Sequence, residues 1–194
     1  MIDPNFVYLA ILLNFIGGSS YVVQTIRGKA KPNRVTWFLW GVIPLIAFFA
    51  ERGEGVGIQS LMTFMVGFIP IMVFIASFFN KNSQWKLTQL DFLCGALSII
   101  GVILWIITKD ANIAIILCII ADFLAGIPTL IKSYKAPETE HYFAYLSGAI
   151  SAGITMLTIT IWNTSHAAFP VYILIFNTIL FSLIRFQLGK RFTK

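Results

Sequence analysis

The chain has 194 residues, of which 58% are hydrophobic and only 11% are charged, and its mean hydropathy is +0.84. This composition excludes an ordinary soluble domain and is typical of a protein that crosses a membrane several times. The net charge of +6 could suggest a nucleic-acid partner. We expect none, because the basic residues are spread over short segments at the ends of apolar stretches and form no single stripe.

Apolar stretches predict an all-α membrane protein with seven transmembrane helices. A helix rises about 1.5 Å per residue, so about 20 residues cross roughly 30 Å of hydrocarbon. The first stretch follows MIDPN, which lacks the basic segment of a secretory signal, and no small-residue cleavage site closes it. We therefore expect a retained helix. The predicted spans are 5–26, 35–51, 58–79, 90–108, 111–133, 141–162 and 169–187.

The basic residues predict the orientation of these spans. Lys and Arg collect on the cytoplasmic side of membrane proteins. The seven spans place all of them on one side except Arg52 and Lys109. This bias puts the N-terminus outside and the C-terminus in the cytoplasm, as an odd number of spans requires. We expect an integral membrane protein in contact with the lipid bilayer, most simply of a bacterial plasma (inner) membrane.

Two matching runs indicate an internal duplication. The runs begin at Asn14 and Asp122, which lie near the centres of the first and fifth spans. Both spans are expected to run from outside to inside, so the two copies are parallel. Three helices per copy would invert the second copy, and the fourth span restores its direction. The pairs at a constant offset of 108 positions are Asn14 and Asp122, Phe15 and Phe123, Gly18 and Gly126, Tyr21 and Thr129, and Thr25 and Ser133.

The duplication divides the chain into three parts. Residues 5–79 form the first three-helix repeat, residues 80–110 form a cytoplasmic loop and a linker helix, and residues 111–194 form the second repeat with a basic tail. The third and seventh spans also correspond, at an offset of 110 positions, and this match sets Gly67 opposite Asn177.

The second repeat continues from Gly126 through Pro128 to Lys132 and Pro137, whereas the first repeat has Ser20 in place of Pro128. With the order of spans, this pattern resembles the SWEET and PQ-loop (MtN3-like) superfamily of membrane transporters. The resemblance implies two parallel three-helix bundles joined by a linker helix, a 3+1+3 arrangement. It also implies a substrate-binding role for Asn177, because SWEET-like carriers use an asparagine on the third helix of a repeat. The departure at Ser20 leaves the subfamily open.

Asp122 is the only acidic residue that lies within the predicted spans away from their ends. An ionised carboxylate in the middle of a membrane costs about 2.5–3.5 kcal/mol on insertion scales. No Lys or Arg of another span lies at that depth. We therefore expect Asp122 to face a watery cavity, bind substrate and couple transport to protons. The alternative is a carboxylic acid that neighbouring hydroxyl groups satisfy.

Asn14 occupies the symmetry-related position, and together with Asp122 it would flank a binding site at the membrane midplane. A hydrogen bond between helices is the other use for such a residue. Trp40, in the second span, could stack on a sugar-like or aromatic ligand. The predicted substrate-binding residues are thus Asn14, Trp40, Asp122 and Asn177.

Four small or cyclic residues are candidate hinges, namely Gly18, Pro44, Gly126 and Pro128. Proline removes a backbone hydrogen bond and kinks a helix, and glycine permits close approach and bending. Alternating access requires helices that bend. The alternative is that these residues are simply tolerated within membrane helices.

The chain offers no arrangement of nucleophile, base and orienting group, so we expect no enzymatic activity and no cofactor. We expect no metal either, because His141 and His166 lie at opposite membrane surfaces. The sequence favours a secondary transporter, a facilitator or proton-coupled, for a small polar solute such as a sugar. The alternative is a receptor or regulatory protein that binds without transport. A structural scaffold would place Asn14 and Asp122 in tightly packed protein with no cavity, and a homo-oligomer is compatible with any of these functions.

Overall fold

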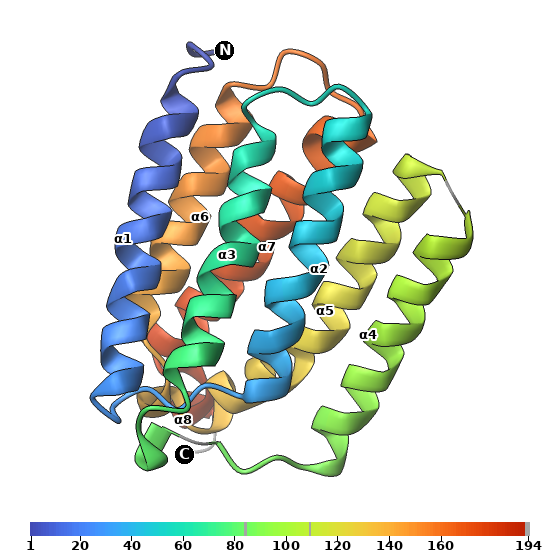
Figure 1. Cartoon of the computed structure of the whole chain (residues 1–194). Coiled ribbons are helices and arrows are strands. Elements are labelled where there is room, and N and C mark those ends of the chain that lie inside the picture. Colours follow the sequence, from blue (N-terminus) through green and yellow to red (C-terminus); the bar gives the residue numbers. More distant parts are fainter. Residues whose placement is uncertain (84, 109, 193–194) are drawn as a thin grey trace.

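Seven long helices run alternately up and down, and the two termini lie at opposite ends of the molecule (Figure 1). The structure is a computed structural model, and it describes residues 1–83, 85–108 and 110–192. These ranges contain helices and no strand. Lys109 and Lys194, which the orientation argument used, lie outside them. The helices are α1 (Phe6–Ile26), α2 (Arg34–Gly53), α3 (Ser60–Ala76), α4 (Gln89–Thr108), α5 (Ala111–Lys135), α6 (Tyr142–Leu157), α7 (Thr164–Arg185) and the short α8 (Leu188–Phe192), with single 3-10 turns η1 (Lys81–Ser83) and η2 (Pro137–Thr139).

Four of the helices, α1, α2, α5 and α7, are long and apolar enough to cross a membrane. Helices α3 and α6 are apolar but shorter, with 17 and 16 residues. Large apolar side chains point outward on several helices, including Leu12, Ile99, Ile116 and Ile175, each between 46% and 56% exposed. Such surfaces suit contact with lipid chains. The expectation of a helical membrane protein is confirmed at this level.

Short polar side chains set where three of the helices begin. The Asn33 side chain accepts hydrogen bonds from two backbone amides in the first turn of α2, Asp110 accepts one in α5, and Asn163 accepts one in α7. These caps satisfy amides that have no partner within the helix. Because Asn163 is a cap, α7 begins at Thr164, five residues before the predicted start at 169. The sixth helix ends at Leu157 and not at 162, since the Thr158 hydroxyl turns back to the Thr155 carbonyl.

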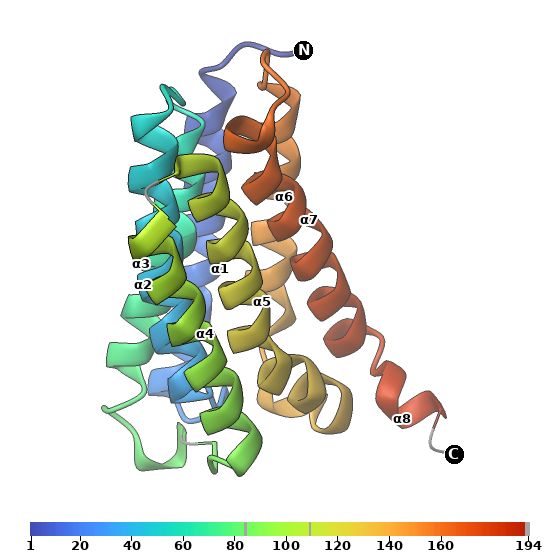
Figure 2. The same ribbon diagram turned by 90° about the vertical axis from the view of Figure 1, so that its right-hand side faces the viewer.

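Six helices contact one another in a ring in the order α1, α3, α2, α5, α7 and α6, and we call α1–α3 the first half and α5–α7 the second half. In the first half, α3 lies between α1 and α2; in the second half, α7 lies between α5 and α6. The halves meet along two helix pairs, α1 with α6 and α2 with α5. Helix α4 lies at the periphery, mainly against α5, and α8 continues from α7 at the C-terminal end (Figures 1 and 2). The buried hydrophobic core takes side chains from α1, α2, α3, α5, α6 and α7.

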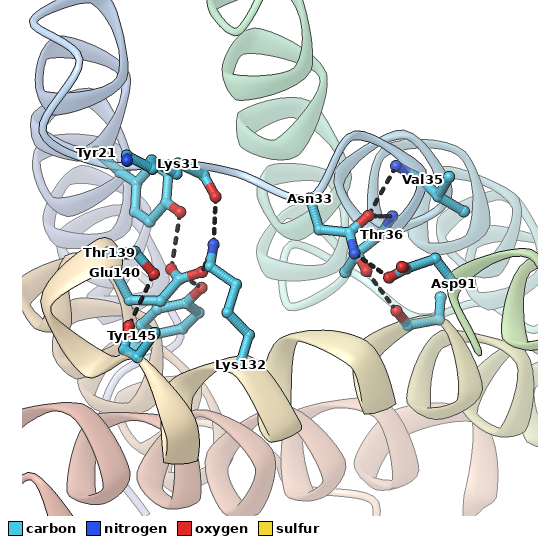
Figure 3. Close-up of polar contacts among 12 residues, drawn as sticks. Tyr21, Lys31, Asn33, Val35, Thr36, Asp91, Lys132, Thr139, Glu140 and Tyr145 are labelled. Carbon is cyan, nitrogen blue, oxygen red and sulfur yellow. Dashed lines mark hydrogen bonds and ion pairs between the residues drawn. The ribbon is translucent and has the colours of Figure 1, made fainter. Parts of the chain in front are cut away.

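A polar contact fixes the start of α4 to the start of α2 (Figure 3). Asp91 is 2% exposed, and one of its carboxyl oxygens accepts a short hydrogen bond from the Asn33 amide. Its other carboxyl oxygen accepts from the Thr88 hydroxyl at 2.7 Å. Asn33 thus caps α2 with its oxygen and holds α4 with its nitrogen. These hydrogen bonds hold the start of α4 against the start of α2.

Candidate solute-binding pocket

A buried cavity of about 70 Å³ lies between the two halves. All four predicted substrate-binding residues, Asn14, Trp40, Asp122 and Asn177, line it. They come from α1, α2, α5 and α7, so the site takes residues from both halves. Each buried water needs about 10–15 Å³ of such space, so the cavity can hold several water molecules. Its other lining residues are Gly18, Trp37, Met65, Val66, Ile69, Pro70, Ala144, Tyr145, Gly148, Ile173 and Phe176.

The Asp122 carboxyl is held by one of its two oxygens. Oδ2 accepts a hydrogen bond from the Tyr172 hydroxyl of α7 at 2.7 Å. The backbone carbonyl of Asp122 accepts a second bond, at 3.1 Å, from the indole nitrogen of Trp40. Oδ1 is buried and has no hydrogen-bond partner within the described part of the chain. The residue is 2% exposed, so this free oxygen can be satisfied only by a proton, a water molecule or a bound solute.

The two asparagine amides are also available for binding. Asn14 is 7% exposed, and Asn177 is partly buried. Neither side chain makes a hydrogen bond to any other residue that the structure describes, so the bond between helices that could have explained Asn14 is not formed there. Asn177 lies against Gly148, where a Cβ atom would approach its amide nitrogen to 2.8 Å. The absence of a side chain at Gly148 makes room for this amide at the cavity.

Aromatic rings form one side of the cavity. Trp37 and Trp40 meet edge to face at 5.5 Å between ring centroids, and Trp40 meets Phe176 in the same way at 5.7 Å. Gly126 packs against Phe176 and Trp40, because a Cβ atom there would lie 2.5 Å from Phe176 and 3.0 Å from Trp40. The missing side chain at Gly126 is therefore required for this packing. Trp40 presents its ring to the cavity while its nitrogen is already engaged.

The four candidate hinges lie inside continuous helices. Pro44 lies within α2 and Pro128 within α5, and each helix continues on both sides of its proline. Gly18 faces α3, where a Cβ atom would come within 2.4 Å of Ile69. Close packing therefore explains Gly18 and Gly126 in this conformation. Bending at any of the four positions stays a prediction.

A buried ionic cluster closes the end of the cavity where α6 begins (Figure 3). Glu140 forms an ion pair with Lys132 at 2.6 Å, and its second carboxyl oxygen accepts hydrogen bonds from Tyr21 at 2.7 Å and Tyr145 at 2.9 Å. Lys132 also donates a short hydrogen bond to the Lys31 carbonyl. Tyr145 lines the cavity, so the cluster lies directly beyond it. It joins α1, the α1–α2 loop, α5 and the start of α6.

Lys132 lies at the same end of the molecule as Lys31, but unlike an ordinary basic residue at a helix end it does not reach water. Its side chain is 1% exposed, because Glu140 neutralises the ammonium group inside the protein. The Trp85 ring also lies 4.9 Å from this group. Tyr21 and Glu140 lie 119 positions apart, and no local sequence pattern predicts their contact. The only signal in the sequence is a basic residue that ends an apolar run and an acidic residue eight positions later.

His141 follows the cluster at the start of α6. Its Nε2 atom lies 3.0 Å from the Ser20 hydroxyl oxygen. Partial burial lowers the pKa of His141 below its ordinary value, although the charge of Glu140 acts in the opposite direction. The imidazole is therefore neutral at neutral pH and links α6 to α1.

The cysteines and the histidines provide no metal site in the described part of the chain. Cys94 and Cys118 are buried free thiols. Nowhere in the described ranges do three or more His, Cys, Asp or Glu side chains come together as a metal site would require. Comparisons with models of protein families, with curated proteins and with solved structures find no match. The interpretation of the cavity therefore depends on its own residues.

Proposed function

We propose that this protein is a secondary transporter related to the SWEET and PQ-loop superfamily, which moves a small polar solute by alternating access around the central cavity. One observation carries the proposal: Asn14, Asp122 and Asn177, from different helices and from both halves, line one cavity, where Oδ1 of Asp122 has no hydrogen-bond partner among the described residues. Buried polar groups without partners are costly, and transporters place such groups where solutes bind.

The helix packing supports the 3+1+3 arrangement. If α1, α2 and α3 are exchanged with α5, α6 and α7, respectively, the same pairs of these six helices remain in contact. The α1–α6 contact, for example, becomes the α5–α2 contact, which is also present. This is the pattern expected of two parallel repeats related by a twofold axis, with α4 as the linker. The basic residues gather at the end where α1 ends and α8 lies, which favours a cytoplasmic C-terminus.

The lining favours a neutral or cationic solute over an anionic one. It contains one carboxyl and two amides, and none of its residues is Lys, Arg or His. Amides and a carboxyl can bind hydroxyl or amino groups, and the rings of Trp37 and Trp40 can cover the apolar face of a solute such as a sugar. An anionic solute would meet only the Asp122 carboxyl as a charged group.

The central pocket offers only a small space in this conformation. Pockets that enclose drug-sized ligands measure about 300–1,000 Å³, so a cavity of about 70 Å³ must widen before a solute enters. At one end, the hydrogen bonds from Tyr21 to Glu140 and from Lys132 to the Lys31 carbonyl join the two halves. Opening at that end requires these contacts to separate, as alternating access demands.

A reconstitution experiment tests the proposal. Purified protein in liposomes is offered radiolabelled sugars, amino acids and vitamins after a thermal-shift screen has selected those that raise its unfolding temperature. Saturable uptake that the Asn14→Ala variant reduces would support transport. Saturable binding without flux would instead identify a receptor, the alternative function of the same site.

A further inference from the structure

A second carboxyl is buried in the span region, at the opposite end of the cavity from Lys132. Glu51 lies in the last turn of α2 and is 2% exposed. In the sequence, Glu51 stands at the end of a predicted span, so it was not counted with Asp122 among the acidic residues inside the spans. In the structure α2 continues to Gly53, and the chain then folds back so that the Val56 amide reaches the Glu51 carbonyl at 3.0 Å. Although Glu51 is the last residue of the predicted span 35–51, its side chain is buried.

The Glu51 carboxyl has the same pattern of partners as Asp122. One oxygen, Oε1, accepts a hydrogen bond from the Thr63 hydroxyl of α3 at 3.0 Å. The other, Oε2, is buried without a partner among the described residues. In each case a neighbouring helix supplies one hydroxyl to one oxygen, and the second oxygen is left for a proton or water.

No cation neutralises Glu51. Arg52 is exposed and donates to the Val56 carbonyl at 3.1 Å. Within the described residues of α3, α4, α5 and α7, no charged side chain forms an ion pair with Glu51. From α5, the Cys118 thiol lies within electrostatic reach of both Glu51 and Asp122. A buried carboxylate without a cation is costly, so the stable form of Glu51 is the neutral acid.

The helix contacts place the two carboxyls along one line. Helices α2 and α5 are antiparallel, because Thr36 bonds to the Ala125 carbonyl and Trp40 to the Asp122 carbonyl. Residues of α2 after Trp40 therefore lie progressively further from Asp122. Glu51 lies beyond the level of Cys118, toward the start of α5. At about 1.5 Å per residue, Glu51 lies roughly 16 Å beyond Trp40 along the helix axis. It thus lies near one membrane surface, while Asp122 lies near the midplane.

We propose that Glu51 is a second proton-binding site, which exchanges protons with the aqueous phase at the α2–α3 end and supplies Asp122. A proton leaves Oε2 of Glu51 and is taken up at Oδ1 of Asp122 when the packing around Ala47 and Cys118, both of which are buried in this conformation, opens to water. The Glu51 carboxylate then regains a proton from the same aqueous phase. This role depends on the proposed function, since a proton supply matters only if Asp122 is loaded and unloaded during transport.

Infrared spectroscopy of the full chain in liposomes tests the site without any solute. A protonated buried carboxyl gives its own carbonyl band, and transfer to heavy water shifts the band as the proton exchanges. We expect two such bands, one lost in Glu51→Gln and the other in Asp122→Asn. Glu54→Gln, an exposed position at the same end of α2, is the matched control and should keep both. A spectrum of Glu51→Gln identical to that of the original chain would overturn the proposal.

The exchange rate tests the supply to Asp122. In Glu51→Gln the band of Asp122 should exchange about tenfold more slowly or slower still, whereas Glu54→Gln should leave the rate unchanged. An unchanged rate in Glu51→Gln would contradict the supply role. If the glutamine variant does not fold, Thr63→Val provides a second test, because loss of the hydroxyl must shift the frequency of the Glu51 band. A protein that shows both bands and no flux would refute transport and retain the second proton site.

Discussion

The Tyr172 hydroxyl donates a 2.7 Å hydrogen bond to Oδ2 of Asp122, and it is the one protein group that holds this carboxyl within the described chain. Tyr172 lies on α7 and Asp122 on α5, so the bond fixes the carboxyl within the second half of the molecule. The other oxygen is left unsatisfied at a cavity that both halves share. The contact positions the carboxyl without neutralising it.

Removing this hydroxyl should weaken both fold and site. In Tyr172→Phe the Asp122 carboxyl loses its only side-chain hydrogen bond, and leaving a buried acceptor unpaired costs about 1–3 kcal/mol. We expect a lower thermal unfolding midpoint in detergent and weaker uptake of the solute found by screening. Tyr8→Phe is the control, because Tyr8 is 56% exposed on α1. Equal midpoints for the two variants would show that the bond contributes nothing.

The Lys132–Glu140 pair should show strong coupling. Removing one partner of a buried ion pair leaves the other charge uncompensated and costs about 3–5 kcal/mol. We expect Lys132→Met and Glu140→Gln each to destabilise the protein strongly, and the double variant to lose less than the two losses added together. Thermal unfolding of all three variants measures this difference.

A surface pair provides the comparison. Lys190 and Glu138 lie 2.8 Å apart, but about half of each side chain is exposed. Solvent screens such pairs, so Lys190→Met and Glu138→Gln should leave the unfolding midpoint almost unchanged. Additive losses in the buried pair, or large losses in the surface pair, would contradict the importance assigned to burial.

The contact between the halves should depend on the lack of a side chain at Gly17. A Cβ atom there would lie 1.6 Å from Oγ of Ser147 on α6 and 2.5 Å from its Cβ. Gly17→Ala should therefore separate α1 from α6 and cost about 1–3 kcal/mol. Combining it with Ser147→Gly should restore part of the loss. Gly53→Ala is the control, since no described atom lies within 4 Å of a Cβ there; a similar loss in this control would point to a general effect of alanine.

His141 should make stability depend on pH in a defined window. Its pKa in the folded state lies below the ordinary value of 6.5, because burial disfavours the charged imidazole. In the unfolded chain the same group takes up its proton near pH 6.5. The unfolded state therefore binds more protons just below that pH, and stability falls as the pH is lowered through this window. Above it, the contribution of His141 is fully present.

Unfolding midpoints between about pH 5 and pH 8 measure this dependence. His141→Gln should flatten the curve, whereas His166→Gln should leave it as in the original chain. A curve that stays equally steep in His141→Gln would assign the dependence to other groups.

The helices could be predicted from the sequence because apolar length is a local property. Each predicted span lies within a few residues of a helix, except where Asn163 and Thr158 move an end by forming local hydrogen bonds. The candidate residues could also be found, since a polar group such as Asp122 is conspicuous in an apolar stretch. The cavity that unites Asn14, Asp122 and Asn177 is a property of the packing, and the repeat only suggested it.

The parts that could not be predicted depend on contacts between distant residues. In the sequence, Lys132 cannot be distinguished from other basic residues at the ends of spans. Its burial depends on Glu140 and Tyr21, which folding brings close to it. The position of Glu51 at the end of a span suggests a solvated side chain. In the structure, the chain after α2 folds back, and the Val56 amide bonds to the Glu51 carbonyl. Burial of an ionisable group near a helix end is decided by neighbouring helices, so composition and periodicity carry no signal for it.

The central claim, that Asp122 binds solute and couples its movement to protons, is tested most directly by uptake into proteoliposomes containing Asp122→Asn. The asparagine can still accept the Tyr172 hydrogen bond, so the variant should insert and fold, as its unfolding midpoint will show. The solute selected by the thermal-shift screen is supplied over a range of external pH, with Glu54→Gln as the control. We predict that Asp122→Asn loses the pH dependence of uptake that the original chain and the control retain; uptake by Asp122→Asn equal to that of the original chain at every pH would contradict the claim.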